Sequence, residues 1–352
     1  MKNACIVLRN NRIPLNGQEF EWGISALLQG GYAADKVYIL SQSDPHEFMQ
    51  TAVECKNFFD NVFVCAHADE LSALRGKVQE LLGGTLTAGN KRFFCIPDGE
   101  EGERAVRGEV IPALRESDPS PLSRSFVRAV GVPSGLLSSA LEEARARAEG
   151  ITFSCHEKDG DVRIEMRYPA DIAKSAADEG MRVLAGRLAD YVYAIDDTPL
   201  NRRVYELLKL RGLKLSVAES FTGGGVAKKI IEIPGASEVL FESVVAYDNG
   251  SKMKRLGVSA KTLAEQGAVS DETAYEMAAG LLSTGGCTAV LSTTGIAGPA
   301  SDDTHKPVGL CYIAAGGKEA VYVYKYLFRG SRGQITARAV NQALFLLYKQ
   351  IK

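Results

Sequence analysis

The sequence has 352 residues, with 41 Lys and Arg against 43 Asp and Glu, and 45% of its residues are hydrophobic. A length above about 250–300 residues favours two or three domains over one core. The net charge of −2 excludes broad electrostatic binding to nucleic acid or to anionic membranes. No apolar run approaches the roughly 18 residues of a membrane-spanning helix.

The cysteines and histidines show no metal-binding or disulfide pattern. The seven cysteines are scattered and none forms a Cys-x-x-Cys pair, which is typical of reduced thiols. The first residues do not resemble a signal peptide, because Arg9 soon interrupts their apolar run. We therefore expect a cytoplasmic protein. The four histidines share no ligand spacing, which argues against zinc and leaves an oxygen-ligated metal open.

The first 120 residues alternate strand-like and helix-like segments, which predicts a parallel α/β sheet. We expect strands at residues 4–8, 36–40, 61–66 and 92–96. We expect helices at residues 18–28, 46–58 and 101–114. The Ser-Asp-Pro-Ser-Pro run at 117–121 predicts a linker after this domain.

The next unit, residues 121–198, has the β-α-β-β-α-β order of a small split βαβ domain. We expect its strands at 124–130, 151–155, 161–168 and 191–195. We expect its helices at 135–148 and 170–190. The Asp-Asp-Thr-Pro run at 196–199 marks the next boundary, and residues 199–352 form a third domain of alternating helices and short strands.

The first candidate site in the third domain surrounds Ser220. An apolar strand at 215–219 leads into Ser220, Phe221, Thr222 and three glycines, and a helix follows. Such a hinge places hydroxyls and backbone N–H groups at a helix start, where anions bind, and glycine lets a ligand approach the backbone. The alternative is a simple helix cap with glycines for tight packing, and a glycine-rich turn alone does not exclude it.

The second candidate is Lys252. The segment 244–252 predicts a strand that ends on Tyr247, a turn, and a helix that begins at Lys252. A helix start and burial both lower the pKa of a lysine, and a lysine so altered acts as a general base for a serine. The alternative is an exposed lysine on a helix surface.

Two further loops follow or enter strands. Residues 290–299 run from an apolar strand into a Thr-Gly loop, whose N–H groups are of the kind that hold oxyanions or phosphates. Residues 306–313 predict a loop that enters a central strand. Each is also compatible with an ordinary strand and turn. Because the ends of parallel strands meet at one edge of a sheet, we expect the Ser, Lys and Thr-Gly segments to converge.

Taken together, these segments resemble the CinA family (competence/damage-inducible protein CinA), most strongly its C-terminal nicotinamide-nucleotide amidohydrolase domain. The segments that carry the resemblance are 218–224, 234–237, 247–252, 267–270, 294–299 and 306–309. Family members deamidate nicotinamide mononucleotide to nicotinate mononucleotide and ammonia, and the resemblance implies no cofactor for this reaction. It implies Ser220 as the nucleophile, with Tyr247 and Lys252 activating it. It also implies substrate or oxyanion contacts from Thr222, Gly223, Gly224, Thr294, Gly295, Gly298 and Arg332.

The sequence departs from the family's pattern at several positions. Phe221 replaces a usual Cys, Ser243 stands where a Gly is common, and Ala300 begins a stretch that is usually rich in glycine. Thr336 stands where a second arginine is usual, and the loss of a cation near a phosphate weakens binding. Arg332 is still present, and Arg338 is a candidate to compensate.

The other two domains also resemble parts of CinA. The middle domain resembles its KH-like unit, which implies linkage and a homodimer, and the absence of basic residues around 131–135 argues against a nucleic-acid partner. The first domain resembles a degenerate molybdopterin-binding-like domain, with residues 16–18 and 96–99 matching its motifs. In some members this domain hydrolyses ADP-ribose. Here residues 65–71 replace the phosphate loop and its acidic pair, which implies a scaffold.

Within that replaced loop, Asp69 and Glu70 are the candidate metal ligands, and a solvated helix start is the favoured interpretation. Three hypotheses follow for the whole chain. The first is a cytoplasmic amidohydrolase acting on a pyridine nucleotide. The second is a regulatory protein that binds a nucleotide without turnover. The third is an ADP-ribose pyrophosphatase working through the first domain, which would need a divalent metal.

Overall fold

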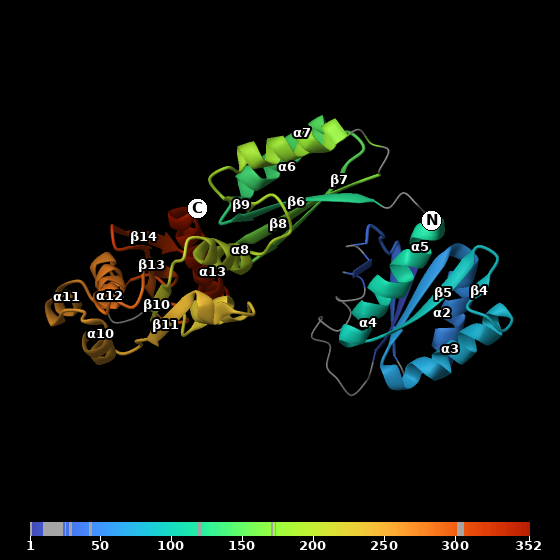
Figure 1. Cartoon of the computed structure of the whole chain (residues 1–352), viewed down its shortest axis with the longest axis horizontal. Coiled ribbons are helices and arrows are strands. Elements are labelled where there is room, and N and C mark those ends of the chain that lie inside the picture. Colours follow the sequence, from blue (N-terminus) through green and yellow to red (C-terminus); the bar gives the residue numbers. More distant parts are fainter. Residues whose placement is uncertain are drawn as a thin grey trace. The chain divides into compact units, whose positions relative to one another are not determined.

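The computed structural model describes residues 2–9, 24, 26–27, 30–41, 44–117, 122–169, 172, 174–300 and 306–352. These residues form three β-sheets with helices packed against them (Figure 1). The chain divides into two compact units, one of Met1–Arg124 with Tyr168–Ala173 and the other of Ser125–Arg167 with Lys174–Lys352. Within the described residues, no helix is long and apolar enough to cross a membrane. The α/β class is confirmed, and the three domain boundaries stay a prediction.

The first unit is built on a five-stranded sheet in the order β2-β1-β3-β5-β4. Its strands are β1 (Asn3–Arg9), β2 (Lys36–Ser41), β3 (Asn61–Ala66), β4 (Thr87–Ala88) and β5 (Lys91–Pro97). All neighbours run parallel except the short β4, so the predicted parallel sheet is confirmed. The central β3 is buried at every position, as expected for a parallel strand covered on both faces.

Helices cover both faces of this sheet. On one face lie α2 (Pro45–Phe58) and α3 (Ala68–Leu82), whose Phe48 and Val78 pack with Ile6. On the other face lie α4 (Gly99–Ala105), a π-helical turn (Val106–Val110) and α5 (Ile111–Ser117). The helix expected at 101–114 is therefore present, interrupted by the π-helical turn. The helix expected at 18–28 lies mostly outside the described residues.

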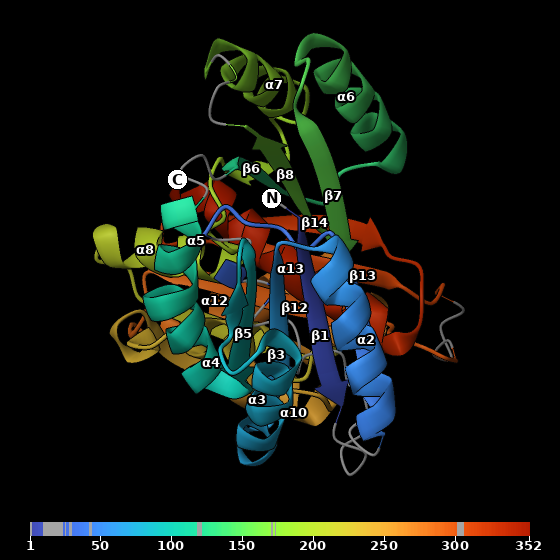
Figure 2. The same ribbon diagram turned by 90° about the vertical axis from the view of Figure 1, so that its right-hand side faces the viewer.

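The middle sheet has the order β7-β8-β6-β9. Its elements in chain order are β6 (Ser123–Val130), α6 (Ser134–Arg147), β7 (Thr152–Lys158), β8 (Asp161–Tyr168), α7 (Lys174–Arg187) and β9 (Val192–Ala194). This is the predicted β-α-β-β-α-β order. Figure 2 shows α6 and α7 side by side over the strands. Asp159 and Gly160 both have positive φ (51° and 80°), which makes the tight β7–β8 turn.

The third sheet has the order β11-β10-β12-β13-β14. Its strands are β10 (Leu215–Glu219), β11 (Leu240–Val245), β12 (Ala289–Gly295), β13 (Leu310–Gly317) and β14 (Val321–Leu327). The first three are parallel, and β13 and β14 are antiparallel to their neighbours. The chain therefore enters β13 at the edge where β10, β11 and β12 end, which brings the predicted loops to one edge.

Two layers of helices enclose this third sheet. One layer consists of α8 (Leu200–Leu210), α9 (Gly225–Ile231) and α13 (Arg332–Ile351), which pack with Leu215 and Val217 of β10. The other layer includes α10 (Asn249–Leu256), α11 (Ala260–Glu265) and α12 (Asp271–Ser283), which lie on the face of Ala218. Because side chains alternate along a strand, Glu219 shares the face of α9 and α13.

Candidate active site

Ser220 lies directly after β10, between the ends of its two parallel neighbours. Its backbone N–H donates to the Thr293 carbonyl oxygen at 3.0 Å, and the Glu219 carbonyl oxygen accepts from the Ala246 N–H at 2.8 Å. These bonds set Ser220 beside the residues that follow Ala246 and Thr293, namely Tyr247 and Thr294. Only 7% of Ser220 is exposed. The predicted hinge is confirmed, because a four-residue turn leads from Ser220 into α9.

Glu219 holds this hinge in place. Its carboxyl group is fully buried and accepts from the N–H groups of Gly224 at 3.0 Å, Val226 at 3.1 Å and Ala227 at 3.0 Å. These are the unpaired donors at the start of α9, so a side chain from the strand end satisfies the helix start. Glu219 is not among the site residues that the sequence predicts; a carboxylate shortly before a glycine-rich helix start is the signal that points to it.

The Thr222 hydroxyl belongs to the same buried network. It donates to the Glu219 carboxyl group at 2.7 Å and lies 2.7 Å from the Thr293 hydroxyl. Since its single hydrogen goes to Glu219, the Thr293 hydroxyl is the donor to Thr222. Ser243 also donates to Glu219, at 3.4 Å. The residue that replaces a glycine in the resemblance thus adds a donor to this network.

Lys252 is buried in the first turn of α10. Only 1% of it is exposed, and its Nζ donates to the Tyr247 carbonyl oxygen at 2.9 Å. Burial lowers the pKa of Lys252 from its ordinary value of 10.5, and the charge of Asp248 opposes this shift in part. Lys252 forms no salt bridge within the described residues. The ammonium is thus not held charged by an ion pair.

The end of β11 and the start of α10 differ slightly from the prediction. The strand ends at Val245 rather than Tyr247, because the chain turns away after Ala246. The helix begins at Asn249, three residues before Lys252, where the Asp248 side chain accepts from the Gly250 N–H at 2.7 Å. Asp248 is therefore the N-cap, and Lys252 lies inside the helix rather than at its first position.

Arg332 joins two of the predicted loops. Its guanidinium donates to the Tyr247 hydroxyl at 3.0 Å and to the Gly298 carbonyl oxygen at 2.7 Å. Arg332 is the first residue of α13, so the start of this helix lies beside Tyr247 and Gly298. Tyr247 is 62% exposed, so the residue that Arg332 contacts lies at the protein surface. Among the described residues, no hydrogen bond joins Ser220 to Lys252 or to the Tyr247 hydroxyl.

The loop after β12 is packed closely against β13. The Thr294 hydroxyl donates to the Ala268 carbonyl oxygen, so its side chain faces the loop before α12. A Cβ on Gly295 would lie 2.6 Å from the Cβ of Cys311, and Gly298 has a φ of +79°. Both glycines are therefore required by the backbone. Lys306 donates to the Val269 carbonyl oxygen at 2.7 Å and ties the two loops together.

The structure also shows where the other residues that depart from the family's pattern lie. Phe221 is buried in the core between the sheet and α13. The Thr336 hydroxyl donates to the Arg332 carbonyl oxygen of its own helix at 3.0 Å. The Arg338 guanidinium donates to the Arg329 carbonyl oxygen. Ala300 is the last described residue of its loop, and His305 lies outside the described residues.

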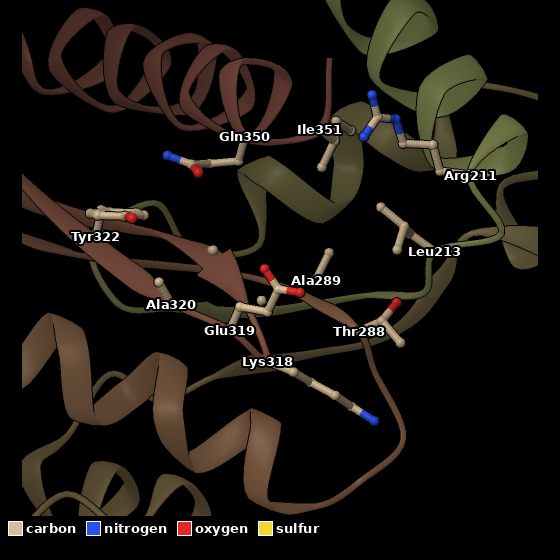
Figure 3. A pocket seen from close by; sticks show the side chains of 12 residues that line it. Arg211, Leu213, Thr288, Ala289, Lys318, Glu319, Ala320, Tyr322, Gln350 and Ile351 are labelled. Carbon is tan, nitrogen blue, oxygen red and sulfur yellow. The ribbon is translucent and has the colours of Figure 1, made fainter.

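A separate hollow of about 410 Å³ lies at the opposite edge of the same sheet (Figure 3). Its lining includes Ala289, the first residue of β12, together with Arg211, Glu319 and Gln350. Since β12 runs for seven residues to Gly295, this hollow lies about 20 Å from the Ser220 edge. It is not part of the candidate active site.

The two acidic candidates of the first unit lie at a helix start. Asp69 and Glu70 are in the first turn of α3, as the favoured interpretation of the sequence had it. Within the part of the chain that the structure describes, no group of three or more His, Cys, Asp and Glu side chains is arranged to hold a metal ion.

Comparisons with known proteins place the third sheet in a family. Residues 197–351 match the family described as the CinA C-terminal domain. A CinA-like protein of Kosmotoga olearia is 37% identical over 252 residues, which cover 70% of this chain and 60% of that protein. A CinA-like protein of Fusobacterium nucleatum is 38% identical over 221 residues, which cover 62% of this chain and 54% of that protein.

A solved structure gives a further match. The crystal structure of the competence/damage inducible protein CihA from Agrobacterium tumefaciens is 37% identical, with 43% of this chain and 94% of that chain covered and a TM-score of 0.42. The chain spans about 60% of the length of the first of the curated relatives above. The matched segment contains Ser220, Tyr247, Lys252 and Arg332. On the match of this segment and of these relatives, the chain belongs to the CinA family.

Proposed function

We propose that this chain is an amidohydrolase that converts nicotinamide mononucleotide to nicotinate mononucleotide and ammonia. The observation that carries the proposal is a buried lysine, Lys252, which forms no salt bridge in the described residues and lies in the first turn of the helix that follows the strand next to Ser220. A serine hydroxyl is a weak nucleophile until a neighbouring base removes its proton. Burial favours the neutral amine that such a base requires.

The proposed reaction has two steps. The Ser220 oxygen attacks the carboxamide carbon while the Ser220 hydroxyl proton passes to the neutral Lys252 amine. The resulting tetrahedral intermediate carries an oxyanion. When the C–N bond breaks, the proton moves from Lys252 to the leaving nitrogen, and ammonia departs. Water then attacks the acyl-serine, losing a proton to Lys252, and releases the carboxylate product with Ser220 restored.

The turn after Ser220 supplies donors for the oxyanion. The Gly223 N–H donates to the Ser220 carbonyl oxygen and the Gly224 N–H donates to Glu219, so both are already used. Among the described residues, the N–H groups of Phe221 and Thr222 make no hydrogen bond. We assign these two N–H groups to the oxyanion, because preorganised backbone donors beside the nucleophile stabilise the charge that develops there.

The pyridine nucleotide as substrate rests on the family resemblance of the segments around Ser220, Tyr247, Lys252 and Thr294. Arg332 supports it, because its guanidinium fixes the Tyr247 hydroxyl and the Gly298 loop beside the hinge. Chromatography of the products after incubation with nicotinamide mononucleotide tests the proposal. We expect nicotinate mononucleotide from the wild-type chain and none from Ser220→Ala. Binding of the nucleotide without any product would contradict catalysis and favour a regulatory protein.

A further inference from the structure

The hollow of about 410 Å³ at the far edge of the third sheet has walls from four segments, all within the second compact unit (Figure 3). They are the residues that follow α8, the start of β12, the β13–β14 turn and the last turn of α13. The volume is within the range of roughly 300–1,000 Å³ that is usual for small-molecule sites. None of the lining residues belongs to the candidate active site.

Two opposite charges on the walls of this hollow are not neutralised by the protein. Within the described residues, the side chains of Arg211 and Glu319 form no ion pair and no hydrogen bond. Figure 3 shows Glu319 across the hollow from Arg211 and Ile351, whereas Lys318 points away from both charges. A charge beside an apolar wall is screened less than a charge in open water. Arg211 and Glu319 are therefore each suited to a group of opposite charge on a ligand.

The main chain at Arg211 is held in one conformation by the end of α8. The Gly212 N–H donates to the Lys209 carbonyl oxygen at 3.1 Å, and Gly212 has a φ of +63°. The Leu213 N–H donates to the Leu208 carbonyl oxygen at 2.9 Å. These two bonds form a Schellman motif, in which Arg211 is the C-cap. Because the motif fixes the backbone that carries the guanidinium, less ordering is needed when a ligand binds.

The acceptors of the hollow are held as well. The Gly317 N–H donates to the Ala320 carbonyl oxygen at 3.0 Å, which closes the turn that carries Glu319. The Gln350 side-chain amide donates to the Tyr324 hydroxyl at 3.2 Å, and the Gln350 side-chain carbonyl oxygen has no partner among the described residues. The last turn of α13 adds the partial negative charge of a helix C-terminus. A carboxylate, an amide oxygen and a helix end together suit an ammonium group.

The lining between these polar groups is apolar. Ile351 and Ala289 are 5% and 2% exposed, and Leu213 is half-buried. Tyr322 adds an aromatic ring and is 53% exposed. Each Å² of apolar ligand surface that these side chains remove from water contributes about 25 cal/mol to binding. A ligand that fits the hollow therefore combines an apolar group with one positive and one negative charge.

We propose that this hollow binds an α-amino acid with an apolar side chain. The α-carboxylate pairs with Arg211, whose planar guanidinium matches a carboxylate with two hydrogen bonds. The α-ammonium donates to Glu319 and to the Gln350 carbonyl oxygen, and the apolar side chain lies on Leu213 and Ile351. A zwitterion neutralises both charges, whereas a simple anion leaves Glu319 unpaired and a simple cation leaves Arg211 unpaired. The site does not rest on the proposed function, because its lining is separate from the candidate active site.

Ligand-observed NMR titration of the full chain with L-leucine tests the site. Two analogues each lack one charge: L-leucinamide has no carboxylate, and N-acetyl-L-leucine has no ammonium. We expect leucine to bind about tenfold tighter than either analogue, since each analogue loses a charge-assisted hydrogen bond. Arg211→Gln should remove only the preference over leucinamide, and Glu319→Gln only the preference over N-acetyl-leucine. The control is Lys261→Gln, which removes an exposed positive charge on α11, outside the lining, and should change neither preference.

The outcomes decide for or against the site without reference to ammonia release. Arg211 and Glu319 are both exposed, so we expect the variants to fold, and their melting temperatures check this. An absence of saturable leucine binding at millimolar concentration overturns the site. Preferences for leucine that survive Arg211→Gln and Glu319→Gln also overturn it, because the amino acid then binds elsewhere on the chain. Loss of each preference in its own variant supports the site, whether or not the chain deamidates a nucleotide.

Discussion

The Lys252 ammonium donates a hydrogen bond of 2.9 Å to the backbone carbonyl oxygen of Tyr247. This bond uses one N–H of Lys252 and orients the amine. The other positions on the nitrogen can then exchange a proton. Burial lowers its pKa from 10.5, which increases the neutral fraction at working pH. The hydroxyl of the same tyrosine accepts a hydrogen bond from Arg332, so Tyr247 contacts both the proposed base and the arginine expected to bind substrate.

The first prediction concerns pH. A base is active only when deprotonated, so kcat/KM for nicotinamide mononucleotide should rise with pH through the lowered pKa of Lys252 and then level off. The rise should be complete below the pH at which an ordinary lysine titrates. Initial rates across the pH range, with circular dichroism to confirm folding, measure this. A flat profile would contradict Lys252 as the base.

The second prediction compares two substitutions of that lysine. Arginine keeps the positive charge but does not lose its proton in proteins, so Lys252→Arg should be as inactive as Lys252→Ala. Tyr247→Phe removes only the bond to Arg332 and should slow the reaction less than either. Lys254→Gln, on the exposed face of the same helix, is the control. A folded Lys252→Arg enzyme with near-normal kcat would make the lysine a substrate anchor instead.

The third prediction concerns Glu219. Glu219→Gln brings an amide N–H₂ group to a place where five donors already point, so at least one buried hydrogen bond is lost. We expect a loss of about 1.5–3 kcal/mol in the free energy of unfolding and a lower kcat, since the hinge is no longer held. Denaturant titration measures the first effect. The exposed Glu265→Gln should show neither effect, and a Glu219→Gln chain as stable and active as wild type would remove the role given to Glu219.

Sequence patterns predicted the hinge at Ser220 because an apolar strand, a glycine run and a helix are each local signals. They did not predict that β13 runs antiparallel, since periodicity carries no information on strand direction. They also missed Glu219, because its function depends on α9 turning back over the strand end.

The fourth prediction concerns the first unit. Asp69 and Glu70 lie in the first turn of α3, where they favour the helix start. We therefore expect the full chain, with magnesium or manganese, to release no AMP from ADP-ribose above a heat-inactivated control. Liquid chromatography of the nucleotides measures this. Metal-dependent AMP release that survives Ser220→Ala would assign a pyrophosphatase to the first unit.

Ammonia release from nicotinamide mononucleotide tests the central claim most directly. The wild-type chain should release one ammonia for each nicotinate mononucleotide formed, without added metal or cofactor. Ser220→Ala should lower kcat by about 10⁴–10⁶ while still binding the nucleotide, because only the attacking oxygen is lost. A Ser220→Ala chain that retains a tenth of the wild-type rate would contradict the covalent mechanism, and a wild-type chain that releases no ammonia would contradict the proposed function itself.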